Sequence, residues 1–247
     1  MKQCWADILG GCSEIYSNEH YVGRGALFAN KKVKTRGLHR DLDGRSIHVS
    51  DLQAHILCKT HNSNLSDVDN EAINLKNVLE QLLKEENKDD LLEGSGLWTP
   101  TQHKVSGRLI GRWLCKLHCN FVTLKGVDPP EYYVHHAFGM SIDPTPRFYM
   151  RAQFNDVFSY QQRIRYFNYP SGPCKENEYG TFHVFFMGFH FLVCPYDLTE
   201  PIKAKLTEVS GDQSYLMNWM EKLDKIAIET EGIITKSITF DWSDGNT

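Results

Sequence analysis

The sequence predicts an α+β fold in which a small metal-stapled N-terminal module precedes a larger mixed domain. Three observations predict it: two clusters of metal-ligating residue types within the first 61 positions, a stretch with helical spacing of apolar residues from position 66, and repeated aromatic, β-branched runs beyond position 130. With 247 residues, 41% apolar and 23% charged, the composition is that of a globular protein. The length suits one large domain or two modest ones.

The first regular element is a helix beginning at Ser66. A capping box is expected there, with the Ser66 hydroxyl accepting from the backbone N–H of Asp69 and the Asp69 carboxylate reaching back. Apolar residues then recur at helical spacing, namely Val68, Ala72, Leu75, Val78, Leu79, Leu82 and Leu83. Charged residues follow, and the segment EGSGLWTP at 93–100 contains the breakers Gly, Ser and Pro. We therefore expect a module at 1–88, a linker at 89–100 and a second domain at 101–247.

The second domain should hold an antiparallel sheet with flanking helices. An apolar stripe predicts a helix over roughly 103–122, and a second helix is expected over 212–230. Between them, aromatic and β-branched runs predict strands at 131–141, 147–155, 163–169 and 181–194, separated by Asp-Pro and Pro-Ser-Gly-Pro turn segments. A last strand is expected over 232–242.

Four residues in the N-terminal module have the chemistry of a zinc site: Cys4, Cys12, Cys58 and His61. Zinc in structural sites takes four thiolate or imidazole ligands, usually delivered as two close pairs. Cys58 and His61 form a short pair, whereas Cys4 and Cys12 require the intervening Gly10-Gly11 to turn the chain back. The alternative is that Cys4 and Cys58 are small buried hydrophobic residues. Metal binding would explain how a Gly-rich segment with little core of its own becomes ordered.

The segments CSEIYSNEH and ILCKTHNSNLSDVD around these ligands resemble the HNH (treble-clef, ββα-metal) endonucleases over residues 1–85. The resemblance implies that His20 is the general base that activates water, and that Glu19 and Asn62 bind a catalytic Mg²⁺ or Mn²⁺. Adjacent strand residues point to opposite faces, so Glu19 and His20 would share one ion only at a strand end or bulge. The middle residue of the family motif stays open among His48, Asp51, Gln53 and His55.

A basic segment lies between the two parts of this motif. It contains Lys31, Lys32, Lys34, Arg36, Arg40 and Arg45. Such a segment beside a catalytic histidine could hold phosphates through sequence-independent charge attraction. A solvated loop is the equally weighted alternative.

The leading hypothesis is a metal-dependent endonuclease that hydrolyses DNA, with RNA the less favoured substrate. The formal charge of −4 gives no overall basic signal, although nucleic-acid binding needs only a local basic face. The alternatives are a zinc-stabilised nucleic-acid-binding or partner-binding protein without catalysis, which could belong to a phage-defence or toxin-like assembly. A protein partner or a second copy would then bind through the C-terminal domain.

Seven cysteines, an odd number, and the acidic residues near the start argue against a secreted disulfide protein. No apolar run is long enough to span a membrane. A cytoplasmic protein is expected.

Overall fold

The computed structural model describes residues 4–20, 32–36, 46–48, 53–89, 101–152, 163–168, 182–186, 189–195, 220–230 and 233–243. Within these ranges the chain mixes helices and strands, as an α+β fold requires. The expected linker beyond residue 89 lies outside the described residues. None of the helices in the described part combines the length and apolar content of a membrane span.

The N-terminal third contains short strands followed by two helices. A 3-10 turn (Asp7–Leu9) precedes β1 (Glu19–His20), β2 (Lys32–Arg36), β3 (Ser46–His48) and β4 (Gln53–Ala54). The helices α2 (Lys59–Ser63) and α3 (Ser66–Asp89) follow directly. β1 and β4 pair antiparallel, with Glu19 opposite Ala54 and His20 opposite Gln53. The β1–β4 pair therefore joins the two stretches of chain that carry the metal-ligating residues.

The helix expected from residue 66 is confirmed as α3, but its first turn differs from the expected capping box. The Ser66 hydroxyl donates to the carbonyl of Ser63, and the Asp69 carboxylate binds Lys116 instead of a backbone N–H. A distant ammonium is a stronger partner for a carboxylate than a neutral amide is. The Asp69 carboxylate therefore makes a contact between distant segments and does not cap its own helix.

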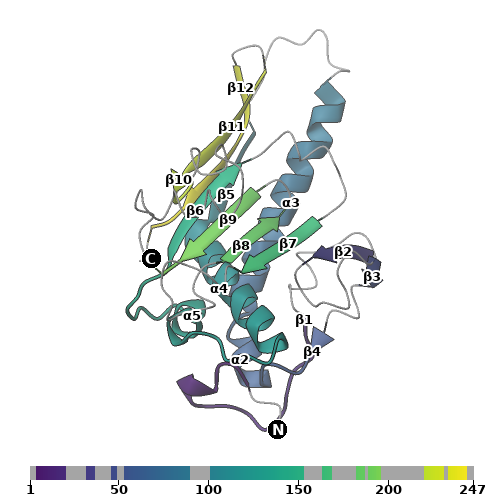
Figure 1. Cartoon of the computed structure of the whole chain (residues 1–247). Helices are drawn as coiled ribbons and strands as arrows, with labels where there is room; N and C mark the ends of the chain where they lie inside the picture. The colour runs from purple at the N-terminus through teal and green to yellow at the C-terminus, as the bar shows by residue number, and fades with distance from the viewer. Residues whose placement is uncertain are drawn as a thin grey trace.

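The centre of the molecule is α4 (Gly107–Leu124), which is buried along almost its whole length. It packs against α3 and against α5 (Glu131–Ala137). Its Gly111 faces the ring of Phe148, so α4 also lies close to the neighbouring sheet. In Figure 1, α3 and α4 cross the strands, and α2 and α5 lie at the end of the molecule that holds the N-terminus.

Two larger sheets are seen among the described residues. The strands of the first are β6 (Arg147–Ala152), β7 (Arg163–Asn168), β8 (Phe182–Phe186), β9 (Phe189–Cys194) and β10 (Met220–Glu221), joined by β2 and β3. Its order is β10-β6-β9-β8-β7-β2-β3, and only the β2–β7 pair is parallel. The second sheet has the order β11-β12-β5, formed by β11 (Lys225–Thr230), β12 (Ile233–Asp241) and β5 (Thr101–Ser106). The mainly antiparallel sheet with flanking helices agrees with the expected fold class.

The N-terminal and C-terminal parts share one hydrophobic core. A single cluster of buried side chains includes Trp5, Leu57 and Leu75 together with Trp113 and Phe191. In addition, β2 extends the edge of the C-terminal sheet through its pairing with β7. Residues expected to form a separate nuclease-like module are thus packed into the same body as the C-terminal strands.

Two expected elements at the start of the C-terminal part are wrong in type or extent. The strand expected over 131–141 is the helix α5, because Pro130 is its N-cap and Glu131 stabilises its first turn. The helix expected from residue 103 begins at Gly107, where the Ser106 hydroxyl accepts from the backbone N–H of Leu109. Residues 101–106 are instead a strand beside β12.

The second expected helix, over 212–230, is also wrong where the structure describes it. Residues 220–221 and 225–230 are strands, and the latter pairs with β12 along its whole length. Pairing with a neighbouring strand outweighs the local helical pattern here. Residues 212–219 lie outside the described residues. The expected run 181–194 contains two paired strands, β8 and β9.

Candidate metal centre and the neighbouring strand

Backbone pairing and a tight turn bring the N-terminal segment to the candidate metal centre. The N–H of Trp5 donates to the carbonyl of Ile56 at 3.0 Å, which places Cys4 beside the segment that ends at Cys58. Gly10 and Gly11 then have φ values of 72° and 69°, the left-handed region that favours glycine. This turn brings Cys12 back toward Cys4. The expectation that the two glycines reverse the chain between the cysteines is therefore confirmed.

Cys58 and His61 are brought together by the first turn of α2. Cys58 is the N-cap, and its sulfur accepts from the backbone N–H of His61 at 3.4 Å. The backbone N–H of Cys58 donates in turn to the sulfur of Cys4, also at 3.4 Å. The helix geometry thus orients the imidazole and the thiol toward the same point.

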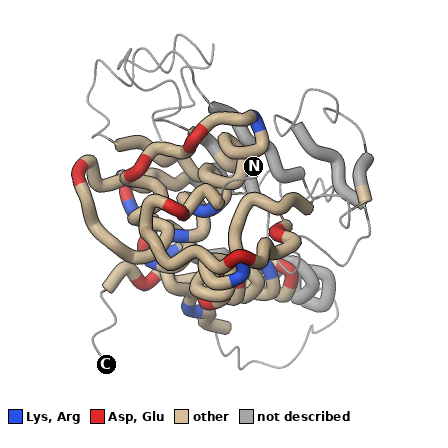
Figure 2. The backbone as a smooth tube through the Cα atoms, turned by 90° about the horizontal axis from the view of Figure 1, so that it is seen from below, with Lys and Arg blue, Asp and Glu red and all other residues tan. Residues whose placement is uncertain are grey.

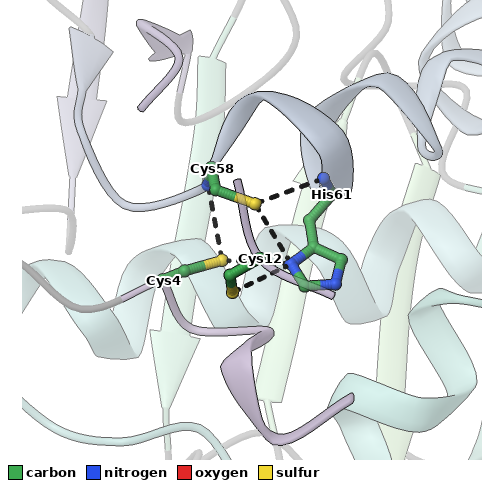
Figure 3. Close-up of side chains that lie close together, drawn as sticks. All are labelled: Cys4, Cys12, Cys58 and His61. Carbon is green, nitrogen blue, oxygen red and sulfur yellow. Dashed lines mark hydrogen bonds between the residues drawn. The ribbon is translucent and has the colours of Figure 1, made fainter. Parts of the chain in front are cut away.

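The four side chains converge as a tetrahedral zinc site requires (Figure 3). The sulfurs of Cys4, Cys12 and Cys58 lie 3.3, 3.6 and 3.3 Å from Nδ1 of His61. Ordinary zinc–sulfur and zinc–nitrogen bond lengths in a tetrahedron separate sulfur from nitrogen by about 3.6 Å. All four ligand atoms lie within 4.8 Å of one another. The donor set and its spacing therefore fit one zinc ion.

The thiols differ in how readily they ionise without a metal. Burial raises the pKa of Cys4 to about 12. Burial also opposes ionisation of Cys58, but hydrogen bonds from His61 and Ser13 outweigh it and lower the pKa to about 6. Cys58 is consequently a thiolate at neutral pH, whereas Cys4 needs a cation to deprotonate it, as a coordinated zinc does. Cys12 is the exposed member of the set.

The C-terminal part contributes one wall of this centre. Phe138, which follows α5, meets the ring of His61 edge-on at 5.5 Å between centroids, and its ring lies 5.9 Å from that of Trp5. Sequence reasoning treated the N-terminal third as self-contained and did not connect residue 138 with the metal ligands. No local pattern marks such a contact between distant segments.

Glu19 and His20 point to opposite faces of β1, as strand alternation dictates. Glu19 is 4% exposed, and its Oε1 lies 2.7 Å from Nζ of Lys116. The same ammonium lies 2.7 Å from Oδ2 of Asp69. The three charged groups, Glu19, Asp69 and Lys116, form a network that joins β1, α3 and α4, and we call it the Lys116 network.

In the Lys116 network one ammonium attracts two carboxylates, which repel each other, in a poorly solvated place. Burial raises the pKa of Glu19, against the attraction of Lys116. Burial lowers the pKa of Lys116, but the two carboxylates more than offset this, so that its pKa is raised. The ammonium therefore stays charged at neutral pH and keeps hold of the Glu19 carboxylate.

The other expected catalytic residues lie nearby on the same short elements. His20 is half-buried, and its Nε2 lies 2.7 Å from Nε2 of Gln53 across the strand pair. Asn62 is half-buried in α2, next to the zinc ligand His61. Of the candidates for the middle motif residue, Gln53 contacts His20, His48 and His55 are exposed, and Asp51 lies outside the described residues.

The expected donor set for a catalytic Mg²⁺ or Mn²⁺ does not fit such an ion in this arrangement. The Glu19 carboxylate is bound to Lys116 and turned into the core, away from the face that holds His20. Hence the structure brings the four zinc ligands together, but it gives Glu19 a different partner. The roles of Glu19, His20 and Asn62 stay predictions.

Sequence reasoning missed Lys116, because its spacing does not mark it as buried. Lys116 and Asn120 follow Arg108 and Arg112 at four-residue steps along α4, a polar stripe that by itself predicts an exposed face. Buried lysines require a carboxylate partner. Which carboxylates would meet it depended on the packing of β1 and α3 against α4.

The basic segment is only partly described. Lys32, Lys34 and Arg36 lie in β2, whereas Lys31, Arg40 and Arg45 lie outside the described residues. In Figure 2, Lys and Arg positions are interspersed with Asp and Glu positions around the described backbone. Nucleic-acid binding by this segment stays a prediction.

Comparisons with family models, with curated proteins and with solved structures found no match for this chain.

Proposed function

We propose that this chain is a zinc-stapled phosphodiesterase of the HNH type that acts on DNA, with His20 as its general base. One observation carries the proposal: His20 lies on the β1–β4 pair, and β4 leads directly into the Cys58–His61 turn of α2. A strand pair next to a metal-stapled helix start is what the ββα-metal arrangement would need, and this supports the proposal.

Zinc has a structural role in this proposal. All four tetrahedral positions are supplied by protein side chains, which leaves no open position for water or substrate. When bound, the ion cross-links the N-terminal segment to the start of α2. It thereby fixes the strand and helix ends that surround His20.

His20 supplies the proton acceptor. Histidine is the commonest general base at neutral pH, and it needs one ring nitrogen free of a proton. The amide nitrogen of Gln53 donates to Nε2 of His20 and holds the ring in the strand pair, so the base role requires this amide to turn its oxygen toward a protonated Nε2, which leaves Nδ1 free. Water deprotonated by the imidazole would attack the phosphorus of a phosphodiester bound over this face, the bond from phosphorus to the leaving sugar oxygen would break, and that oxygen would take a proton from solvent. We assign no step to Mg²⁺ or Mn²⁺, because the Glu19 carboxylate is bound to Lys116.

A second candidate is a zinc-stabilised nucleic-acid-binding or partner-binding protein without catalysis. The Lys116 network favours it, since it removes from the surface the carboxylate that would bind a catalytic ion. Under this alternative the β1–β4 pair and α2 are a rigid scaffold, and His20 is an ordinary half-buried strand residue.

Cleavage of plasmid DNA, single-stranded DNA and RNA by the zinc-loaded protein tests both candidates, with and without added Mg²⁺ or Mn²⁺. In the His20→Ala variant, cleavage should fall by about 10²–10⁴-fold while the zinc content stays unchanged. His135→Ala, a half-buried histidine of α5, is the matched control and should cleave as the parent does.

Undiminished cleavage by His20→Ala would refute the catalytic assignment. Salt-sensitive binding of nucleic acid by a protein that cleaves none of the three substrates would favour the second candidate.

A further inference from the structure

We infer that Glu19 is a positioning residue: held by the buried ammonium of Lys116, it fixes β1 so that His20 faces Gln53 on the opposite side of the strand. The cleavage part of this inference rests on the proposed function. The geometric part concerns the orientation of His20 and holds for either candidate function.

β1 is too short to be held in place by its own strand pairing alone. This strand has two residues, and its pairing with β4 involves only Glu19 opposite Ala54 and His20 opposite Gln53. Backbone hydrogen bonds from Ser17 to Leu57 and from Lys59 to Ile15 hold the segment before β1, and the side chains of β1 complete the orientation that this pairing begins. Because successive side chains point to opposite faces, an inward Glu19 requires an outward His20.

Lys116 holds Glu19 inward from α4, the helix that is buried along almost its whole length. Its side chain is 1% exposed, and its nitrogen contacts both the Glu19 and the Asp69 carboxylates at 2.7 Å. The next turn of α4 adds Asn120, which hydrogen-bonds Glu19 and whose Oδ1 accepts from Nε1 of Trp5 at 2.8 Å. One face of α4 therefore holds both β1 and the segment that begins with the zinc ligand Cys4.

This arrangement assigns Glu19 a different task from that of an ion ligand. A charge-assisted hydrogen bond in the core is strong and directional, and a buried carboxylate deprived of its cation is costly. Release of Glu19 toward a surface ion would leave the Lys116 network incomplete. The carboxylate thus serves as an anchor whose effect reaches the reacting face through His20.

The Glu19→Gln variant distinguishes two possible roles of Glu19, a hydrogen-bonded anchor of β1 and a ligand of a metal ion. Its amide oxygen can still accept from Lys116, but a neutral amide is a poor replacement for a carboxylate on Mg²⁺ or Mn²⁺. The His20 imidazole is observed directly by ¹H–¹⁵N NMR of the zinc-loaded protein, its signals being assigned by their loss in His20→Ala. We expect Glu19→Gln to keep these signals and to retain cleavage within about 3-fold.

Removing the anchor should disturb His20. In Glu19→Ala and in the double variant Glu19→Gln/Lys116→Met, the ring signals should shift and kcat should fall by about 10–100-fold, with KM little changed. The double variant leaves no unpaired carboxylate at position 19, and Asp69, which loses the same cation, has a side chain that is 25% exposed and can be solvated. Lys76→Met is the matched control: Lys76 is a buried lysine paired with Glu80 at 2.9 Å on α3, and its loss should leave His20 unmoved.

The outcomes separate the inference from the proposed function. If Glu19→Gln abolishes cleavage while the His20 signals stay in place, Glu19 is a ligand and the inference is overturned. Unmoved signals in Glu19→Ala and in the double variant overturn it as well. A parent protein that cleaves nothing refutes the proposed function alone, since the NMR comparison still decides whether Glu19 positions His20.

Discussion

Replacement of one zinc ligand should remove the metal and a definable part of the stability. Cys58→Ser is the informative change because serine is a good N-cap, so α2 keeps its first hydrogen bond while the thiolate is lost. Cys4 and Cys58 are 54 positions apart. A cross-link closing a loop of that length stabilises the folded chain by about 4 kcal/mol in the chain-entropy model.

The expected result is a loss of about one zinc per chain and a fall in Tm of about 8–16 °C, given about 2–4 °C per kcal/mol at this chain length. Elemental analysis and thermal unfolding, each with and without a zinc chelator, measure both quantities. Cys115→Ser is the matched control, since Cys115 is also fully buried but is not among the converging ligands. It should keep its zinc, and the chelator should still lower its Tm.

Two results would refute this reasoning. Retention of zinc by Cys58→Ser would mean that the four side chains are not the ligand set. A Tm of the parent protein that a chelator leaves unchanged, after zinc has been shown to leave, would mean that the ion does not cross-link the folded chain.

Three further predictions follow from packing and charge. Gly107→Ala should destabilise the protein by about 1–3 kcal/mol, because the added carbon would lie 2.4 Å from the ring of Trp242. Burial and the charge of Arg112 lower the pKa of His136 to about 4. Stability should therefore fall by about 3 kcal/mol as pH drops from about 6.5 to 4, where the unfolded chain binds the proton first, and His136→Gln should lack this loss. The pKa of Lys116 is raised, so its stabilising contribution should persist to about pH 10.4 and disappear only above it.

Urea unfolding at a series of pH values measures all three, with a specific comparison for each. Gly111→Ala, whose added carbon would meet Phe148 at 3.1 Å, should cost less than Gly107→Ala, and the reverse order would contradict the packing argument. If the stability of His136→Gln falls with decreasing pH as much as that of the parent, groups other than His136 cause the loss. A Lys116→Met variant whose difference from the parent is constant up to pH 12 would contradict the alkaline prediction.

Local spacing predicted each pair of metal ligands because the constraints within a pair are local, whereas the backbone pairing of Trp5 with Ile56 brings the two pairs together. Cys58 and His61 are separated by one helical turn, and Gly10 and Gly11 supply the only backbone geometry needed to return Cys12 toward Cys4. The long helix α3 was equally predictable, since its apolar period is a property of the segment itself. Each of these features needs no knowledge of what the segment packs against.

The predictions that are wrong concern segments whose structure depends on what lies beside them. The aromatic segment 131–137 has strand-like composition, yet Pro130 and the packing of Tyr133 and Val134 make it a helix against α4. Residues 225–230 become a strand because β12 lies beside them. In both cases a neighbour distant in sequence, or a proline at the boundary, outweighed the preference of the segment.

The sequence by itself determined which side chains can hold a metal and where the long helix runs, because thiol, imidazole and apolar spacing are fixed within a few residues. Only the tertiary structure decided what becomes of Glu19. An acidic residue beside a histidine is compatible with an ion ligand or an anchor, and the choice depends on which cation comes near. That cation is Lys116, 97 positions away in the chain and brought to 2.7 Å by the packing of α4.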